Sequence, residues 1–261
     1  FHLGVYDGVD RSMDEAATAY LDAQLEIAGP VAEEPGPHRV LDIGCGWGSA
    51  LGYLAGRFPG CGRFDGINVS SVQLEYAARR MDQMGIADRV ALYMCDARDI
   101  DLLPDPATGY DLVIARGAVA HFTDDVLERT AAALGRRTRA GGAVVIAEVL
   151  YSGLNTYRSA IADTVDRLAC GNRKSPSQVT DVFQRNGFTA KDIRVLPASE
   201  DTSRWFARLK NRIEEEFPAG APLPALGELH DVAVNLEGPL ARGDVAAYSI
   251  VAIRDGARTT E

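Results

Sequence analysis

Short apolar runs alternate with helix-like stretches between residues 39 and 150. The runs RVLDI, DLVIA and AVVIA are apolar almost throughout, as strands covered on both faces must be. Between such runs, apolar residues recur at helical spacing, for example at Leu51 and Leu54 and again at Leu74 and Ala77. Strands that alternate with helices predict a parallel sheet joined by right-handed crossovers.

The pattern changes after residue 150. A capped helix is expected from Ser175 to Asn186, and the segments DIRVLPAS and AAYSIVAIRD read as two more strands. The residues between those strands, about 199–243, contain the helix-like WFARLKNRIEEEF and a Pro/Gly break at 218–227. An insertion of this length is usually functional, often as a lid or substrate cap.

These patterns together predict an α/β fold with a doubly wound, Rossmann-like sheet. We expect seven strands, mostly parallel, with a helical N-terminal arm and a helical insertion between the last two strands. The expected parts are an arm or lid at 1–38, a main domain at 39–255 that carries the insertion at 199–243, and a tail at 256–261.

Composition narrows the class of protein. The 261 residues are 46% hydrophobic and 25% charged, which suits one sizeable globular domain. No apolar run approaches the roughly 20 residues that cross a bilayer, and residues 1–20 lack the order of a signal peptide, so a soluble cytoplasmic protein without a membrane partner is expected. Because the chain begins with Phe1 rather than Met, we expect natural residues upstream.

The charge points to a small-molecule partner. A net charge of −10 and a pI near 4.9 argue against a protein that coats nucleic acid, because that task needs a basic face. The sequence leaves the oligomeric state open, with a homo-oligomer among the alternatives. Cys45, Cys61, Cys95 and Cys170 have neither CxxC spacing nor a nearby histidine cluster, which predicts reduced structural cysteines and no metal site.

The segment LDIGCGWG, residues 41–48, ends an apolar strand in an acid followed by glycine at every second position. A GxGxG turn that leads into a helix directs backbone N–H groups toward a ligand. A dinucleotide motif, GxGxxG, would need glycine where the chain has Ser49. Gly44, Gly46 and Gly48, preceded by Asp42, resemble the first motif of the class I S-adenosylmethionine-dependent methyltransferases. A glycine-rich turn without a ligand is the alternative.

The resemblance implies a role for each part of this loop and for the later strand ends. The loop would wrap the methionine part of S-adenosylmethionine, and Asp42 would order the loop and the cofactor ammonium. Asn68 stands where the family usually carries an acid for the ribose, a departure shared with cyclopropane synthase-like and small-molecule methyltransferases. Gln73 matches the glutamine that follows in those enzymes, although Ser70 and Gln73 can also form a capping box. Asp65 lies earlier in the strand and is expected to point elsewhere.

Further positions match the same family. Asp96 resembles the acid that accepts from the adenine amino group, with the backbone of Ala97 nearby, although an aspartate there can also cap a turn. Arg116 follows the fourth strand, in a segment that lines both cofactor and substrate in the family. The arm FHLGVYDG resembles segments whose aromatic hydroxyl closes over the cofactor carboxylate, and Tyr6 is the matching residue. The implied product of the cofactor is S-adenosylhomocysteine.

Two residues are candidates for catalysis. His121 lies where the resemblance places a histidine facing the transferable methyl group, and its ordinary pKa suits a general base. A lone histidine is more often structural. Glu148 ends the fifth strand, where a charged group in an apolar run is either functional or expensive to bury.

The insertion carries a basic face. Arg204, Arg208 and Arg212 recur every four residues, with Lys210 close by, so they share one side of a helix. The face is either solvated and paired with 214–216 or placed to bind an anionic substrate, because arginine forks suit carboxylates and diphosphates.

The resemblance leads to a hypothesis and two rivals. The hypothesis is C-methylation of a prenyl diphosphate or terpenoid through a carbocation, with Glu148 or His121 removing a proton. Arg116 and the basic face would hold the diphosphate, with Mg²⁺ if the substrate is a diphosphate. The first rival is O- or N-methylation of an aromatic or glycosylated natural product with His121 as base, and the second is a cofactor-binding protein without catalysis.

Overall fold

The computed structural model describes residues 3–29, 32–33, 35–152, 172–220 and 224–256. Predictions that concern Phe1, Cys170 and the tail beyond residue 256 lie outside this part of the chain. None of the helices within the described ranges is both long and apolar enough to cross a membrane.

Seven strands form one sheet in the order β3-β2-β1-β4-β5-β7-β6. Strands β1 to β5 run parallel to one another, whereas β7 is antiparallel to both β5 and β6. This confirms the predicted mostly parallel, Rossmann-like sheet. The strands are β1 Arg39–Ile43, β2 Arg63–Asn68, β3 Val90–Met94, β4 Tyr110–Arg116, β5 Thr138–Tyr151, β6 Phe188–Val195 and β7 Val245–Arg254.

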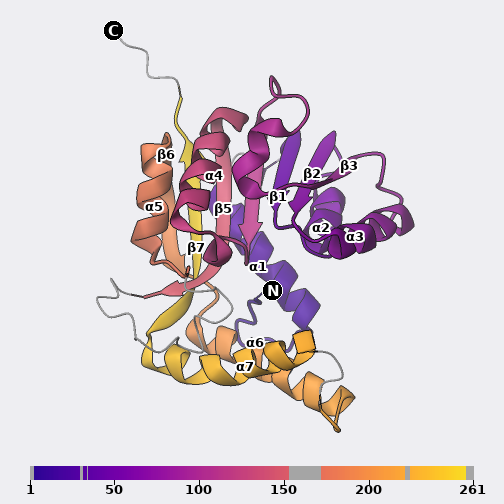
Figure 1. Cartoon of the computed structure of the whole chain (residues 1–261), viewed down its shortest axis with the longest axis vertical. Coiled ribbons are helices and arrows are strands. Elements are labelled where there is room, and N and C mark those ends of the chain that lie inside the picture. The colour runs from indigo at the N-terminus through magenta and orange to yellow at the C-terminus, as the bar shows by residue number, and fades with distance from the viewer. Residues whose placement is uncertain (1–2, 30–31, 34, 153–171, 221–223, 257–261) are drawn as a thin grey trace.

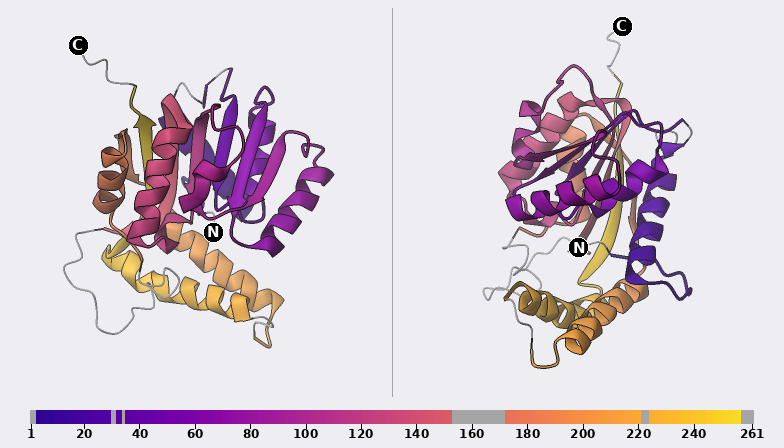
Figure 2. Two further views of the ribbon diagram at one scale, coloured as in Figure 1. Left: turned by 45° about the horizontal axis from the view of Figure 1, so that its top comes forward. Right: turned by 90° about the vertical axis from the view of Figure 1, so that its right-hand side faces the viewer.

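Helices cover both faces of the sheet and one of its ends (Figure 1). One apolar core includes α4 and α5, and a second core on the other face includes α1, α2 and α3, as the turned views of Figure 2 show. The helices are α1 Met13–Ala28, α2 Ser49–Arg57, α3 Ser71–Gln83, α4 Asp124–Arg137, α5 Pro176–Arg185, α6 Ser199–Glu216 and α7 Pro224–Arg242.

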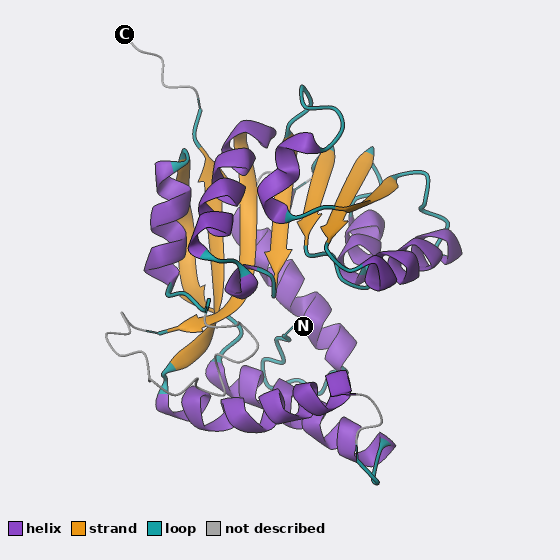
Figure 3. Cartoon of the chain, viewed as in Figure 1, coloured by secondary structure: helices purple, strands orange, loops and turns teal. Residues whose placement is uncertain are grey.

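The predicted insertion is a pair of helices. Helices α6 and α7 pack together and lie across the end of the sheet toward which the parallel strands point (Figure 3). The N-terminal arm packs against them through Leu3, Val5 and Tyr6, and α1 joins the same core through Ala16 and Tyr20. The helices of the insertion and arm are therefore present, while their division from the main domain as lids remains a prediction.

A buried carboxylate links neighbouring strands near the end of the sheet that lies opposite α6 and α7. Asp65 is fully buried and accepts hydrogen bonds from Arg39 at 3.0 and 2.7 Å, from Arg63 at 2.9 Å and from the Tyr110 hydroxyl at 2.9 Å. Because Arg39 is the first residue of β1, Asp65 points away from the glycine loop that follows this strand. The expectation that Asp65 serves no part of the cofactor site agrees with this geometry.

We expect Asp65→Asn to lower the free energy of unfolding by about 3–5 kcal/mol, because the substitution leaves the buried Arg39 guanidinium without its charged partner. Urea denaturation measures the loss. The control is Glu216→Gln, which breaks an exposed pair with Arg212 and is expected to cost less than about 1 kcal/mol. Equal losses in the two variants would contradict this account of the network.

Candidate active site

The glycine loop turns the chain from β1 into α2 with three successive left-handed glycines. Gly44, Gly46 and Gly48 have φ angles of +72°, +54° and +77°. The amides of Gly44 and Cys45 donate to the Ile67 carbonyl at 2.9 and 3.0 Å, which fastens the loop to β2. A Cβ at Gly46 would have its nearest protein atom 3.9 Å away, so the backbone angle demands glycine there and the space beside it is open.

Asp42 and Arg116 are two opposite charges buried at neighbouring strand ends. Asp42 is 3% exposed, and burial raises its pKa to about 7 although the charge of Arg116 opposes the shift. Arg116 is 5% exposed, and burial lowers its pKa. The Arg116 Nη2 donates to the Ala17 carbonyl at 3.3 Å, and the guanidinium lies 5.2 Å from the ring centroid of Tyr20.

The end of β2 brings Asn68 and Gln73 together. The Asn68 side-chain amide donates to the Gln73 side-chain oxygen at 2.7 Å, and Asn68 Oδ1 accepts from the Val69 amide. Ser70 accepts from the Gln73 amide at 3.4 Å and so caps α3. The Gln73 side chain bonds to Asn68 and does not reach back to the Ser70 amide, so only one of the two hydrogen bonds of a capping box is present. Asn68 and Gln73 instead form one polar pair beside the glycine loop.

Asp96 begins a short 3₁₀ helix, Ala97–Leu102, directly after β3. One of its oxygens accepts from the Arg98 amide at 3.0 Å and the other pairs with the Arg98 guanidinium at 2.9 Å. The capping alternative is therefore realised. Each carboxylate oxygen has a second lone pair, so the predicted contact with an adenine amino group stays compatible with the cap.

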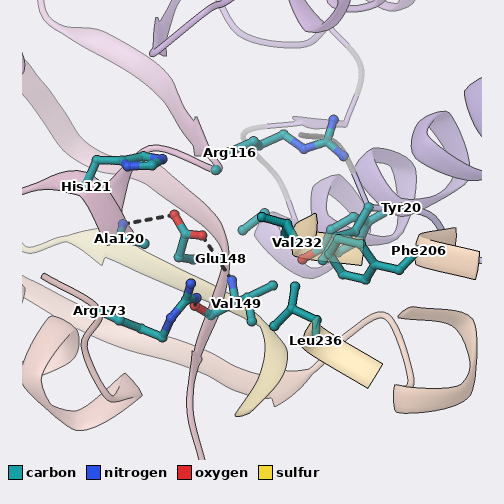
Figure 4. A pocket seen from close by; sticks show the side chains of 13 residues that line it. Tyr20, Arg116, Ala120, His121, Glu148, Val149, Arg173, Phe206, Val232 and Leu236 are labelled. Atoms are coloured by element: carbon teal, nitrogen blue, oxygen red, sulfur yellow. Dashed lines mark hydrogen bonds between the residues drawn. The ribbon is translucent and has the colours of Figure 1, made fainter. Parts of the chain in front are cut away.

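A cavity of about 100 Å³ lies between the carboxyl end of the sheet and the helices that cover it (Figure 4). Its polar lining includes His121, at the end of the 3₁₀ helix Val119–His121, and Glu148 of β5. The apolar part of the wall is formed by Leu3, Ala120, Ala147, Val149, Phe206, Val232 and Leu236.

Glu148 is held rigidly in this cavity. Its two carboxylate oxygens accept from the backbone amides of Ala120 at 3.0 Å and of Val149 at 3.1 Å, as the dashed lines in Figure 4 show. The two N–H donors fix the direction of the carboxylate within a mostly apolar wall. The structure thus brings both candidate catalytic residues, His121 and Glu148, to one cavity, while their chemical roles remain predictions.

Tyr20, Arg173 and the apolar residues of α6 and α7 also line the cavity, although the sequence pattern did not indicate this role. Arg173 is buried and donates to the Val149 carbonyl. Tyr20 lies on the buried side of α1, where its spacing from Ala16 and Gln24 matches a helix face that packs inward. That periodicity predicts burial, but it does not show which cavity a side chain reaches.

The arginines of α6 are not among the residues that line this cavity, and their predicted contact with an anionic substrate stays a prediction. Arg204 and Arg208 pair with Asp10 of the N-terminal arm at 3.1 and 2.6 Å. Their guanidinium groups lie 4.5 and 5.0 Å from the ring centroid of Tyr6. Carboxylate and aromatic partners from the arm thus occupy these cations.

Arg212 and Lys210 form pairs along α6, with Glu216 and Glu214 respectively, both at 3.0 Å. This part of the face is the solvated, internally paired surface that the sequence offered as the alternative. Tyr6 is fully buried, and its amide donates to the Asp201 carboxylate at 2.8 Å. Its position helps to fasten the arm to α6, and its contact with the cofactor stays a prediction.

Comparison with known proteins identifies the family. A family model described as "Methyltransferase domain" matches residues 40–142, the part that carries the glycine loop and Asp96. The chain is 30% identical over 193 residues to the malonyl-[acyl-carrier protein] O-methyltransferase of Dechloromonas aromatica, covering 71% of this chain and 67% of that one. It spans 39%, 42% and 62% of the length of three other curated relatives.

Solved structures share the whole fold. A putative sarcosine dimethylglycine methyltransferase from Galdieria sulphuraria superimposes with a TM-score of 0.81 at 17% identity, covering 97% of this chain and 93% of that one. A geranyl diphosphate C-methyltransferase from Streptomyces coelicolor superimposes with a TM-score of 0.72 at 16% identity, covering 97% and 90%. At such identities the likeness concerns the fold alone.

The chain belongs to the class I S-adenosylmethionine-dependent methyltransferases. Its residues fit that cofactor on two structural observations. The space beside Gly46 is open, and the buried Oδ2 of Asp42 has no hydrogen-bond partner among the described residues, so it can accept from the cofactor ammonium. Asn68 with Gln73 would hold the ribose, and Asp96 with Ala97 the adenine.

We expect Gly46→Val to abolish the rise in melting temperature that S-adenosylhomocysteine produces, because the side chain would fill the open space beside the loop. Differential scanning fluorimetry with and without the ligand measures the rise. The control is Gly141→Val, since Gly141 also has a left-handed φ of +78° with open space around it but lies in the turn that leads into the paired part of β5. Gly141→Val should lose similar stability and still show the rise in melting temperature with S-adenosylhomocysteine. If Gly46→Val also shows that rise, the result counts against the cofactor site.

The buried Asp42 predicts how the stability of the ligand-free protein depends on pH. Its pKa is about 7 in the native state and about 3.9 when unfolded, so the native state binds more protons between pH 4 and 7. The free energy of unfolding should therefore fall as pH rises through this interval, by up to about 4 kcal/mol from this group. Urea titrations at several pH values should show the decline in the native protein and a flatter profile in Asp42→Asn. Parallel profiles would show that burial does not shift this carboxyl.

Proposed function

We propose that the protein transfers the methyl group of S-adenosylmethionine to a small, largely apolar acceptor in the cavity beside Glu148. The observation that carries the proposal is the Glu148 carboxylate, held by two backbone amides within a mostly apolar wall. A fixed negative charge in such a place is suited to an acceptor that becomes positive as it reacts.

Methyl transfer from a sulfonium moves positive charge to the acceptor. The cofactor supplies an electrophilic methyl group, and as the carbon–sulfur bond breaks and the bond to the acceptor forms, the acceptor gains one positive charge. The negative charge of Glu148 would stabilise that positive charge at short range, where the low dielectric strengthens the attraction. The walls from α6, α7 and the arm would exclude water and align the acceptor with the methyl group.

We favour a carbon acceptor, an alkene of a prenyl or terpenoid chain. The aromatic rings of Tyr20 and Phe206 line the cavity with Glu148, and aromatic faces attract cations. The similarity of fold to a geranyl diphosphate C-methyltransferase supports this choice. Mg²⁺ would be required only if the acceptor is a diphosphate. Among the described residues, no group of three or more His, Cys, Asp or Glu side chains could hold a metal ion.

The second candidate is O- or N-methylation with His121 as general base. It is favoured by the position of His121 in the same cavity and by a relative that is named as an O-methyltransferase. A hydroxyl acceptor must lose a proton, whereas an alkene needs a base only after the methyl group has arrived. The two candidates therefore predict different effects of substituting His121 and Glu148.

Labelled S-adenosylmethionine incubated with isopentenyl, geranyl and farnesyl diphosphates, and separately with a phenolic library, tests the choice. We expect label in a prenyl product, and we expect Glu148→Gln to lower kcat by about 100-fold or more while the affinity for S-adenosylhomocysteine stays unchanged. His121→Asn serves as the comparison and should have the smaller effect.

Other outcomes would overturn the choice. Label only in phenols, with kcat lost in His121→Asn and largely kept in Glu148→Gln, would favour the second candidate. Binding of S-adenosylhomocysteine without label in any acceptor would support the alternative of a cofactor-binding protein.

A further inference from the structure

A buried lysine is bonded to the end of the turn that lines the acceptor cavity. Lys174 is 2% exposed, and its ammonium donates to the carbonyls of Phe122 and Asn172. A lysine is rarely buried to this extent without specific partners, because taking an ammonium group out of water is expensive. The Asp124 carboxylate lies 3.8 Å away but is 90% exposed, so water weakens this pair. The two carbonyls are therefore the contacts that direct the ammonium.

The turn Val119–His121 depends on contacts with the rest of the protein. It is a single 3₁₀ turn whose cap residue Ala118 makes no side-chain hydrogen bond, and the backbone bonds that close it are 3.1 and 3.2 Å long. Such short 3₁₀ segments have poor hydrogen-bond geometry and little stability of their own. Yet this turn carries the His121 side chain and the Ala120 amide that donates to Glu148 (Figure 4).

The turn is bonded to β5 at its start and in its middle. The Gly117 amide donates to the Ala147 carbonyl at 2.8 Å, and the Ala120 amide donates to the Glu148 carboxylate at 3.0 Å. The first bond joins two backbones, whereas the second makes the direction of the carboxylate depend on where the turn lies. A shift of the turn would therefore displace the Glu148 carboxylate as well.

Lys174 joins the end of the turn to the same strand. The Phe122 carbonyl, directly after His121, accepts from the Lys174 ammonium. The Lys174 carbonyl in turn accepts from the Tyr151 amide of β5 at 2.9 Å. Lys174 thus supplies a connection between the turn and the strand right beside His121.

The start of α5 is the other place where Lys174 could act, because this residue directly precedes the cap of that helix. Ser175 and Gln178 already form a complete capping box there, so the helix does not need the ammonium. The Lys174 side chain instead reaches the turn. Its contacts therefore favour a role at the cavity over a role in starting the helix.

We propose that Lys174 is a positioning residue of the methyl-transfer site. By holding the Phe122 carbonyl, the ammonium keeps the Ala120 amide directed at Glu148 and keeps His121 at the wall of the cavity. Lys174 is not among the residues that line the cavity, so it acts through the turn. The proposal rests on the proposed function in taking Glu148 and His121 as the groups that act on the acceptor.

Amide hydrogen exchange of the full chain, followed by nuclear magnetic resonance, tests the positioning without an acceptor. We expect Lys174→Met to speed exchange of the Ala120 amide, relative to the amides of β1 and β4, by about 10- to 100-fold, the range typical of losing a hydrogen bond to a charged group. A general loss of stability would instead speed exchange in all three places alike.

Two further variants complete the exchange experiment. Lys174→Gln keeps an N–H donor on a shorter, uncharged side chain, so it should have an intermediate effect, and it carries the test if the methionine variant fails to fold. Lys191→Met is the control. Lys191 also donates to a backbone carbonyl, that of Ala28 at 3.1 Å, but neither residue lines the cavity, so the Ala120 amide should keep its native rate.

The rate of methyl transfer is the second measurement. With labelled S-adenosylmethionine, Lys174→Met should lower kcat by about 10- to 100-fold, because a displacement of about 1 Å in an acting group can cost about 100-fold. The affinity for S-adenosylhomocysteine should stay unchanged, since the residues expected to bind it lie at other strand ends. Lys191→Met should change neither quantity.

The role of Lys174 is overturned if exchange of the Ala120 amide rises no more than exchange in β1 and β4 in the Lys174 variants that fold. A native kcat in those variants would overturn it as well, and either result leaves the proposed function intact. If the native protein transfers label to no acceptor, the proposed function fails, while the exchange of Ala120 still decides whether Lys174 holds the turn.

Discussion

Parallel strands end at the same edge of a sheet, and the chemistry of this protein depends on that constraint. Asp42, Asn68, Asp96 and Arg116 each stand at or just beyond the carboxyl end of a different strand. Their side chains come from distant parts of the chain, yet the order β3-β2-β1-β4 arranges them in one row. The acids and amides in that row can contact an adenosyl amino acid along its whole length. The glycine loop leaves open space for this ligand next to the protein backbone.

The helices at this edge turn an open row into a closed site. Asp10 joins the arm to Arg204 and Arg208 of α6, which holds Leu3 at the wall of the cavity. Phe206, Val232 and Leu236 complete an apolar enclosure around Glu148. Without that enclosure, water would screen the carboxylate and compete as a nucleophile. The contacts of Arg204 and Arg208 with the arm thus help to hold the arm at the wall of the cavity.

Local patterns in the sequence were sufficient to predict the sheet, the helices and the glycine loop. The loop could be predicted because turn, acid and helix start are adjacent in the sequence, and Asp96 could be predicted because the rule of strand ends applies to any parallel sheet. The partners of Arg204 could not, since Asp10 lies 194 residues away and an ion pair leaves no periodic signal. A similarly long separation in sequence hid the fact that Tyr20 and Phe206 line the same cavity. The sequence therefore left the α6 face open between a solvated, paired surface and a substrate contact, and it did not indicate the pairs that Arg204 and Arg208 form with the arm.

The central claim is that the cofactor lies along the row of strand ends with its sulfur toward the cavity of Glu148 and His121. A crystal structure of the complex with S-adenosylhomocysteine measures this directly. We predict adenine beside Asp96, the amino-acid part beside the glycine loop and Asp42, and the sulfur directed toward the cavity of Glu148. A sulfur atom that faces away from Glu148, or adenine placed away from Asp96, would contradict this claim.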